Sequence, residues 1–256
     1  MELKTLDVPG YKNQKVPNIL VVQSNPTGHL GIILPGYRHS ADMADLHYAG
    51  RILREQGADL LRVEYAYYQT DYLSQPENGQ NQRISEDVFA VCNACLAFRP
   101  YTKITLVGKS LGTKAMGFLL ADERFQKANC VWSTPPLTTE WLYSRIEQVH
   151  PPSLFIFGTA DDYYKPKMLN HFVNVTNGHS VIIEGANHGL EIPESIPKSL
   201  MGLGQIVQGL QEFLGSEKSS SVHAGPGSQS AALVPERSEW EWEGLGRLSY
   251  SEVFLC

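Results

Sequence analysis

Short apolar runs alternate with longer segments of helical periodicity along the chain from residue 19 onward. The apolar runs cover residues 19–23, 30–34, 60–65, 104–108, 130–133, 154–158 and 180–184. Apolar residues recur at helical spacing over residues 43–56, 83–98, 111–121, 165–171 and 198–214. Strands and helices that alternate in this way build a mostly parallel sheet with helices on both faces. The sequence therefore predicts one α/β domain over residues 1–214.

The composition changes after residue 214. Residues 215–256 are rich in Ser and Gly and carry little periodic apolar content until near the end. Such a segment buries too little apolar surface to offset the entropy of ordering. We expect residues 215–256 to form a disordered C-terminal extension. The alternative is an element that docks on a surface through its large apolar residues, which are Trp240, Trp242, Tyr250, Phe254 and Leu255.

Composition and charge narrow the class of partner. Of the 256 residues, 42% are hydrophobic and 19% charged, as in ordinary globular proteins, and the net charge is -6. This charge gives no electrostatic reason to bind nucleic acid or an anionic membrane. Residues 1–10 lack the apolar core of a secretory signal, and no apolar run is long enough to span a bilayer. We expect a cytoplasmic protein that acts on a small molecule, and the oligomeric state stays open.

Two of the four cysteines form a CxxC pattern at Cys92 and Cys95. Both fall near one face of the helix expected over residues 83–98, so we expect buried core thiols rather than a redox or zinc site. No histidine pair has the spacing of a zinc site. The glycines near residue 110 lack the spacing of a phosphate-binding loop. The sequence therefore implies neither a metal nor a cofactor.

The pentapeptide Gly-Lys-Ser-Leu-Gly at residues 108–112 has the Gly-x-Ser-x-Gly pattern. A strand is expected before it and a helix after it, which is the context in which this pattern exposes a nucleophilic serine on a sharp turn. Ser110 would also lie at a helix N-terminus, where the helix dipole favours negative charge. Ser110 is therefore a candidate nucleophile, whereas the pattern alone would fit any glycine-flanked turn.

A serine nucleophile needs a general base and a group that orients it. In this architecture an acid and then a histidine follow later strands at the carboxyl edge of the sheet. Asp161 and Asp162 follow the strand expected at residues 154–158, and His188 follows the strand at 180–184. The candidate triad is therefore complete and in order.

With these three motifs, the sequence resembles the α/β-hydrolase superfamily over residues 30–214. The resemblance is to its small members without a lid, of the dienelactone-hydrolase-like or serine-esterase-like kind. In such families the acid stands in a Gly-x-x-Asp pattern, which selects Asp161, with Asp162 as the alternative. His188, in a glycine-containing loop similar to the histidine loop of the family, is then expected to be the general base, with Asp161 orienting it.

The oxyanion hole is expected to use two backbone N–H groups. One belongs to Leu111, directly after the nucleophile, and the other to Tyr37 in the loop at residues 34–40. This loop reads Pro-Gly where related hydrolases often read His-Gly. Arg38 and His39 in the same loop are weak candidates for substrate contacts.

The remaining substrate-binding candidates are Tyr67 and Tyr68, which follow the strand expected at residues 60–65 and would overhang the same rim. Packing beneath a long loop is an equal alternative for both tyrosines. Residues 134–152 leave room for little more than a short helix where lipases insert a cap. We therefore expect no substantial cap domain and an open pocket for small acyl substrates.

Together these residues predict a serine hydrolase that cleaves a carboxylic ester through an acyl-enzyme. The same machinery also serves thioesterases and peptidases, which remain the alternative activities. A binding protein that keeps the scaffold without catalysis is a further alternative, although this chain has all three triad residues.

Overall fold

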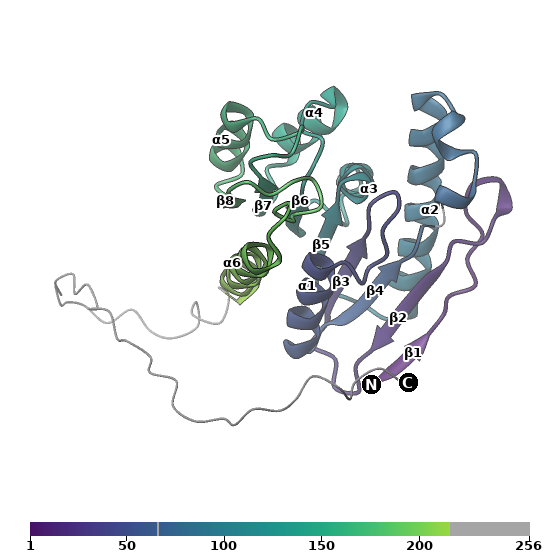
Figure 1. Cartoon of the computed structure of the whole chain (residues 1–256). Coiled ribbons are helices and arrows are strands. Elements are labelled where there is room, and N and C mark those ends of the chain that lie inside the picture. Colours follow the sequence, from purple (N-terminus) through teal and green to yellow (C-terminus); the bar gives the residue numbers. More distant parts are fainter. Residues whose placement is uncertain (66, 216–256) are drawn as a thin grey trace, which may run out of the picture. The chain divides into compact units, whose positions relative to one another are not determined.

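The computed structural model describes residues 1–65 and 67–215, and these form a sheet with helices on both faces (Figure 1). The sheet has eight strands in the order β1-β2-β4-β3-β5-β6-β7-β8. The strands are β1 (Glu2–Lys4), β2 (Asn18–Val22), β3 (His29–Leu34), β4 (Asp59–Val63), β5 (Lys103–Lys109), β6 (Asn129–Ser133), β7 (Ser153–Gly158) and β8 (His179–Ile183). Pairing from β4 to β8 is parallel, whereas β2 is antiparallel to both β1 and β4.

Among the described residues, six α-helices connect or follow these strands. They are α1 (Ala44–Glu55), α2 (Glu77–Phe98), α3 (Leu111–Leu119), α4 (Glu140–Val149), α5 (Pro166–Val175) and α6 (Ile196–Gly215). Three short 3-10 turns lie at Tyr11–Asn13, Tyr67–Gln69 and Tyr72–Ser74. The predicted fold class, a mostly parallel sheet flanked by helices, is confirmed.

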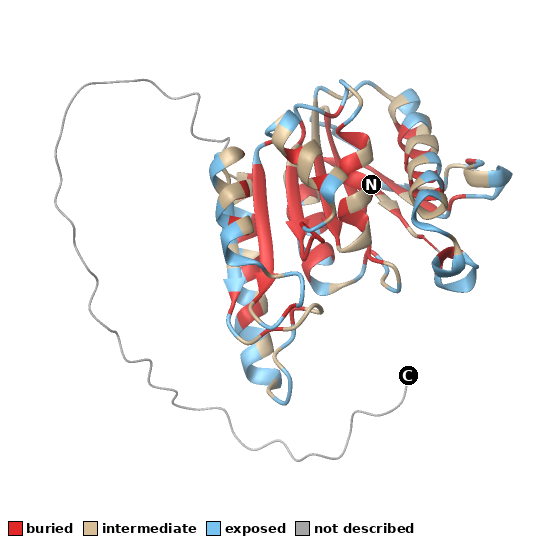
Figure 2. Ribbon diagram, turned by 90° about the horizontal axis from the view of Figure 1, so that it is seen from above, coloured by how far each residue is buried: buried red, intermediate tan, exposed pale blue. Residues whose placement is uncertain are grey.

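The sheet separates two hydrophobic clusters. Residues of α2, α3, α4 and α5 pack on one face, and residues of α1 and α6 pack on the other. Figure 2 shows the buried residues concentrated along the strands and on the inner faces of the helices. Successive residues of β5 show the alternation, since Leu106 belongs to the first cluster and Val107 to the second.

Where the structure differs from the sequence-based boundaries, polar residues are the cause. Helix α2 begins at Glu77, six residues before the expected start, because its first two turns are polar and show no apolar periodicity. Strand β1 is a three-residue edge strand with no buried residue, so it carries no hydrophobic signal. The strand expected to reach residue 65 ends at Val63.

The expected absence of a large cap between β6 and β7 agrees with the described chain. Residues 134–152 contain a loop and the ten-residue helix α4 and no further element. Cys92 and Cys95 are buried in the core, and burial raises the pKa of both thiols, that of Cys95 to about 12. No helix among the described residues is long and apolar enough to cross a membrane. The expectation for residues 216–256 lies outside the described residues.

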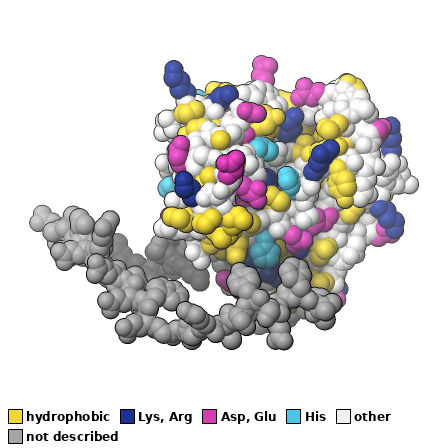
Figure 3. Space-filling view, in the orientation of Figure 1, with side chains coloured by type: hydrophobic (Ala, Val, Ile, Leu, Met, Phe, Trp, Pro, Cys, Tyr) yellow, Lys and Arg dark blue, Asp and Glu magenta, His cyan; other side chains and the backbone are white. Residues whose placement is uncertain are grey.

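Figure 3 shows how charged and hydrophobic side chains are distributed on one face of the molecule. Acidic and basic side chains are interspersed among the described residues on this face, without an expanse of either sign.

The order of the parallel strands reverses between β3 and β5. Strand β3 lies between β4 and β5, so the chain moves outward to β4 and then returns to the other side of β3. Leu34, the last residue of β3, pairs with Gly108 of β5. The loops after these two strands therefore begin side by side at the carboxyl edge, where open α/β sheets bind their ligands.

Helix α3 begins directly against the end of β3. A Cβ atom at Gly112 would lie 1.8 Å from the carbonyl oxygen of Leu34 and 2.9 Å from that of Pro35. Both contacts are with backbone, which cannot move aside as a flexible side chain could. Only glycine fits at this position.

Two glycine-to-alanine substitutions should therefore change stability in opposite directions. Gly112→Ala forces α3 away from β3, and the overpacking should lower the free energy of unfolding by about 1–3 kcal/mol. Gly204→Ala introduces a methyl group into α6 where no atom lies within 4 Å. It should raise the free energy of unfolding by about 0.5–1 kcal/mol because alanine is the better helix former. Urea unfolding measures both, and equal effects would contradict the close contact at Gly112.

Candidate active site

Ser110 lies on a sharp turn between β5 and α3. Its backbone has φ 49° and ψ −111°, a sparsely populated positive-φ conformation that costs about 1–3 kcal/mol for a residue with a side chain. The Ser110 N–H donates to the Ser133 carbonyl at 2.9 Å, and the Thr113 N–H donates to the Ser110 carbonyl at 3.0 Å. These bonds hold the strained turn, which presents the hydroxyl at the carboxyl edge of the sheet.

His188 connects Ser110 to Asp161 through both ring nitrogens. Its Nε2 lies 3.0 Å from Ser110 Oγ, and its Nδ1 lies 2.9 Å from Asp161 Oδ2. An ionised carboxylate only accepts hydrogen bonds, so it favours the tautomer with the proton on Nδ1. The lone pair of Nε2 then faces the hydroxyl of Ser110.

Two neighbouring loops bring the acid and the histidine together. Strands β7 and β8 pair in parallel, with Gly158 opposite Ile183. Beyond them, the Ala160 N–H donates to the Ala186 carbonyl at 2.9 Å. A Cβ atom at Gly158 would lie 2.1 Å from that same carbonyl oxygen, so this glycine allows the loops to touch. The close packing fixes how Asp161 faces the imidazole.

The two adjacent aspartates have different environments. The Asp161 side chain is 1% exposed, and both of its oxygens have partners, because Oδ1 also accepts the Tyr163 N–H at 3.0 Å. Asp162 is exposed. The structure therefore brings Asp161, and not Asp162, to His188.

The loop after β3 lies against the serine turn. A Cβ atom at Gly36 would lie 3.5 Å from the Lys109 carbonyl oxygen and 3.6 Å from Ser110 Cβ. Tyr37 follows directly in this loop, and Leu111 follows Ser110 as the first residue of α3. Both expected oxyanion donors therefore belong to segments that meet at Ser110.

The four candidates for substrate contacts have different surroundings. Arg38 is exposed and lies over the ring of Tyr37, with its guanidinium carbon 5.9 Å from the ring centroid. Tyr68 is exposed, and its hydroxyl accepts a hydrogen bond from Gln69. His39 is half-buried near the site. Its pKa lies below the ordinary value because burial disfavours the charged ring and because Lys109 and His188 are close.

Tyr67 does not face an open pocket, which corrects the expectation that it lines one. It is 3% exposed, and its hydroxyl donates to Asp87 Oδ2 at 2.7 Å. Its ring stacks between those of Tyr65 and Tyr72, and Tyr72 in turn stacks on Tyr37. This tyrosine column packs beneath the loop that carries Tyr37, so Tyr67 supports the site from below.

Burial sets the ionisation of the groups at the base of this column. It raises the pKa values of the Tyr65, Tyr67 and Tyr72 hydroxyls, which stay protonated. Burial also raises the pKa of Asp87, although hydrogen bonds from the Tyr11 N–H and the Tyr67 hydroxyl oppose the shift. The column is therefore a neutral support anchored on one carboxylate.

Sequence reasoning missed a group of buried polar residues behind Ser110. Lys109 and Asp45 are 0% and 5% exposed, and Lys109 Nζ lies 3.4 Å from Asp45 Oδ2. The Ser133 hydroxyl donates to the same oxygen of Asp45. One signal was available. Lys109 comes two residues after Val107 in the same strand, so the two side chains point to the same face of the sheet, and that of Val107 lies in the core. Asp45 gave none, because it fits the acidic first turn of an ordinary helix.

Tyr163 was also missed. Its ring centroid lies 5.5 Å from that of His188, and the side chain is 41% exposed. It therefore lies against the imidazole while remaining partly exposed. The nearby Asp161 indicates that Tyr163 belongs to a loop of the site. Its ring could not be placed from the sequence, because its direction depends on the backbone conformation of that loop.

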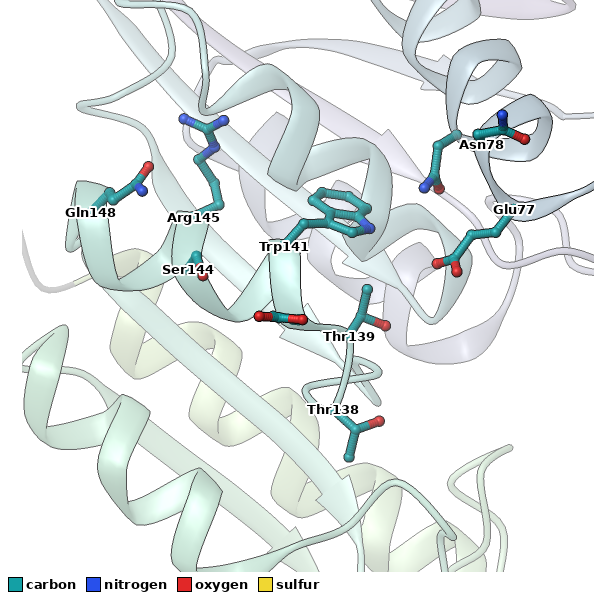
Figure 4. A pocket seen from close by; sticks show the side chains of 10 residues that line it. Glu77, Asn78, Thr138, Thr139, Trp141, Ser144, Arg145 and Gln148 are labelled. Atoms are coloured by element: carbon teal, nitrogen blue, oxygen red, sulfur yellow. The ribbon is translucent and has the colours of Figure 1, made fainter.

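A wide groove lies on the side of the molecule between α2 and α4, with a volume of about 910 Å³. Figure 4 shows Trp141 and Arg145 of α4 on one wall and Glu77 and Asn78 of α2 on the other. None of its lining residues belongs to the group around Ser110. Within the part of the chain that the structure describes, no cluster of His, Cys, Asp or Glu could hold a metal ion.

The surroundings of His39 predict a pH effect on stability. NMR titration should give His39 a lower pKa in the folded chain than in the chain unfolded in urea. Between these two pKa values the unfolded chain binds more protons, so the free energy of unfolding should rise with pH. His39→Gln should flatten that rise. A folded-state pKa equal to or above the unfolded one would contradict the desolvation of this ring.

No protein-family model and no curated protein matches the sequence. Solved structures do match in fold. An α/β serine hydrolase without a lid from Xanthomonas campestris has a TM-score of 0.62 at 20% identity, covering 88% of this chain and 97% of that one. An α/β serine hydrolase homologue from Coxiella burnetii has a TM-score of 0.59 at 20% identity, covering 81% and 96%.

The esterase domain of a Rhodothermus marinus protein gives a TM-score of 0.55 at 14% identity, covering 84% of this chain and 99% of that domain. At such identities the likeness concerns the fold. The strand order, the serine turn after β5 and the short β6–β7 connection agree with it. The described chain has the α/β-hydrolase fold, in the form that lacks a lid.

Proposed function

We propose that this chain is a serine hydrolase that cleaves a carboxylic ester through Ser110, His188 and Asp161. The observation that carries the proposal is the unbroken set of hydrogen bonds from Ser110 Oγ through the imidazole to a buried carboxylate. A serine hydroxyl is a weak nucleophile unless a base lies within hydrogen-bond reach and is itself oriented. Both conditions are met here before any substrate arrives.

In the proposed reaction, His188 Nε2 takes the proton from Ser110 Oγ as this oxygen attacks the ester carbonyl carbon. The protonated ring then donates to the leaving alcohol oxygen, and an acyl-enzyme remains. Water attacks the acyl group with His188 as base, which releases the carboxylic acid and restores Ser110. Throughout, Asp161 orients the ring and stabilises its charged form.

We assign the oxyanion hole to the backbone N–H groups of Leu111 and Tyr37. The first lies at the N-terminus of α3, where the helix dipole favours negative charge. The second belongs to the loop whose Gly36 lies against Lys109 and Ser110. Donors fixed on rigid backbone need not reorganise as the negative charge develops, which is the main source of their effect.

An ester is the proposed substrate, because the serine nucleophile and the open site fit the esterase-like members of this fold. The name of the Rhodothermus marinus domain, an esterase, agrees with this choice. Thioesters and amides are the alternative substrates for the same groups, and a ligand-binding protein without turnover is the alternative from another class. We further propose a cytoplasmic location, which fits the free thiols of Cys92, Cys95 and Cys130.

A fluorophosphonate probe tests the nucleophile directly. It should label wild-type protein at Ser110 and should fail to label Ser110→Ala. The wild type should also hydrolyse members of a panel of p-nitrophenyl esters, thioesters and anilides, with esters preferred. Folded wild-type protein that is neither labelled nor active on any panel member, yet binds one of its compounds, would support the binding-protein alternative instead.

The two adjacent aspartates provide a matched pair of variants. Asp161→Asn retains the shape but favours the wrong imidazole tautomer, so kcat should fall by about 10⁴-fold, as in serine proteases. Asp162→Asn alters an exposed neighbour and should leave kcat within about 2-fold. Steady-state kinetics on the best panel ester measures both. A reversal of the two effects would assign the acid to Asp162.

A further inference from the structure

Lys109 is a lysine whose side chain is completely buried beside the nucleophile. Its Nζ lies 3.4 Å from Asp45 Oδ2 and donates to the His188 carbonyl oxygen at 3.3 Å. Asp45 Oδ2 also accepts the Ser133 hydroxyl. A charged network therefore lies behind the serine, and the hydrolytic steps proposed above make no use of it.

Burying the ion pair of Lys109 and Asp45 costs free energy. Removing two charges from water costs several kcal/mol per ion, and apolar residues of similar size are often as stable or more so. Stability alone therefore does not account for a lysine at this position. The role of Lys109 and Asp45 therefore depends on the groups that their hydrogen bonds hold in place.

The pair joins four segments that meet behind the site. Asp45 lies in the first turn of α1, Lys109 ends β5 and Ser133 ends β6. The fourth segment is the loop that carries His188. Ser133 also accepts the Ser110 N–H through its carbonyl, and Gly36 of the oxyanion loop lies against the Lys109 carbonyl. The network therefore bonds to the His188 loop through the ammonium, and the turn of Ser110 and the loop of Gly36 adjoin the backbone of its residues.

The bond to the His188 carbonyl has a specific consequence. The imidazole is held by Ser110 and Asp161 through its ring, and its side chain is 37% exposed. Its loop follows β8, an edge strand of which Ile183 is the one buried residue, and is tied to the loop after β7 at Ala186, two residues before His188. An ammonium that donates to the backbone of the same residue fixes the point from which the ring projects.

We propose that Lys109 is a positioning residue of the triad, which holds the backbone of His188 so that its ring stays within reach of Ser110, with Asp45 and Ser133 holding the ammonium in turn. This inference rests on the proposed function for its kinetic consequence. The positional consequence, a fixed imidazole in the free protein, does not depend on turnover.

The test uses the double variant Lys109→Met/Asp45→Asn of the full chain. Methionine keeps an unbranched chain that is one heavy atom shorter than lysine, and asparagine keeps an oxygen for the Ser133 hydroxyl. One positive and one negative charge are removed together, so no unpaired buried charge remains and the net charge near His188 is unchanged. What is lost is the donor to the His188 carbonyl.

We expect kcat on the best panel ester to fall by about 10- to 100-fold, because a small displacement of a catalytic group has effects of this size. KM should stay within about 2-fold, since no contact with substrate is removed. In NMR spectra of the free protein, the Nδ1 proton of His188 should lose its hydrogen-bonded signal or broaden through exchange with water. The same signal is assigned by its absence from His188→Gln.

The matched control is Asp59→Asn/Arg99→Met. Asp59 is also fully buried and pairs with Arg99 at 3.3 Å, but it lies at the amino end of β4, at the opposite edge of the sheet. This variant should be destabilised in urea and should keep both kcat and the His188 signal. An equal loss of kcat in the control would show that lower stability alone explains the effect, and would overturn the proposal.

Retention of wild-type kcat and of the His188 signal in the folded Lys109→Met/Asp45→Asn variant would also overturn it. The two proposals fail separately. Wild-type protein that neither turns over the panel nor reacts with the fluorophosphonate would refute the hydrolase function. The NMR comparison would still decide whether Lys109 holds His188.

Discussion

The contact between Gly112 and the Leu34 carbonyl fixes how near α3 begins to the end of β3. Because no side chain separates them, the turn before α3 is compressed and Ser110 adopts a positive φ. The same approach places the loop after β3 beside Ser110, so Tyr37, the proposed oxyanion donor, and the proposed nucleophile share one small region. The local strain is sustained because β5 is paired on both sides by parallel strands.

Much of the fold and of the candidate triad could be predicted from the sequence, because the patterns that indicate them are local in the chain. Buried parallel strands give continuous apolar runs, and the turns that follow them are short. A residue placed just after a strand can therefore only lie at the carboxyl edge. Ser110, Asp161 and His188 each follow a strand in this way, and the structure brings their side chains together.

The features that could not be predicted depend on packing between distant segments. Strand alternation indicates that Lys109 points inward, but its burial requires a charged partner from α1 that no local pattern indicates. Tyr67 has the chemistry of a pocket residue, but the carboxylate of Asp87 on α2 draws its hydroxyl inward. In both cases a charge buried by tertiary contacts overrides the usual preference of a polar side chain for water.

The short connection between β6 and β7 bears on the fate of an acyl-enzyme. With only α4 in this connection, nothing of the size of a lid covers the serine in the described chain, and the His188 side chain stays partly exposed. Water, at the concentration of bulk solvent, would then compete with any alcohol or amine for the acyl group. Enzymes that pass an acyl group to an alcohol or amine must exclude water from this step. For the acyl-enzyme proposed above, the open architecture would favour hydrolysis over acyl transfer.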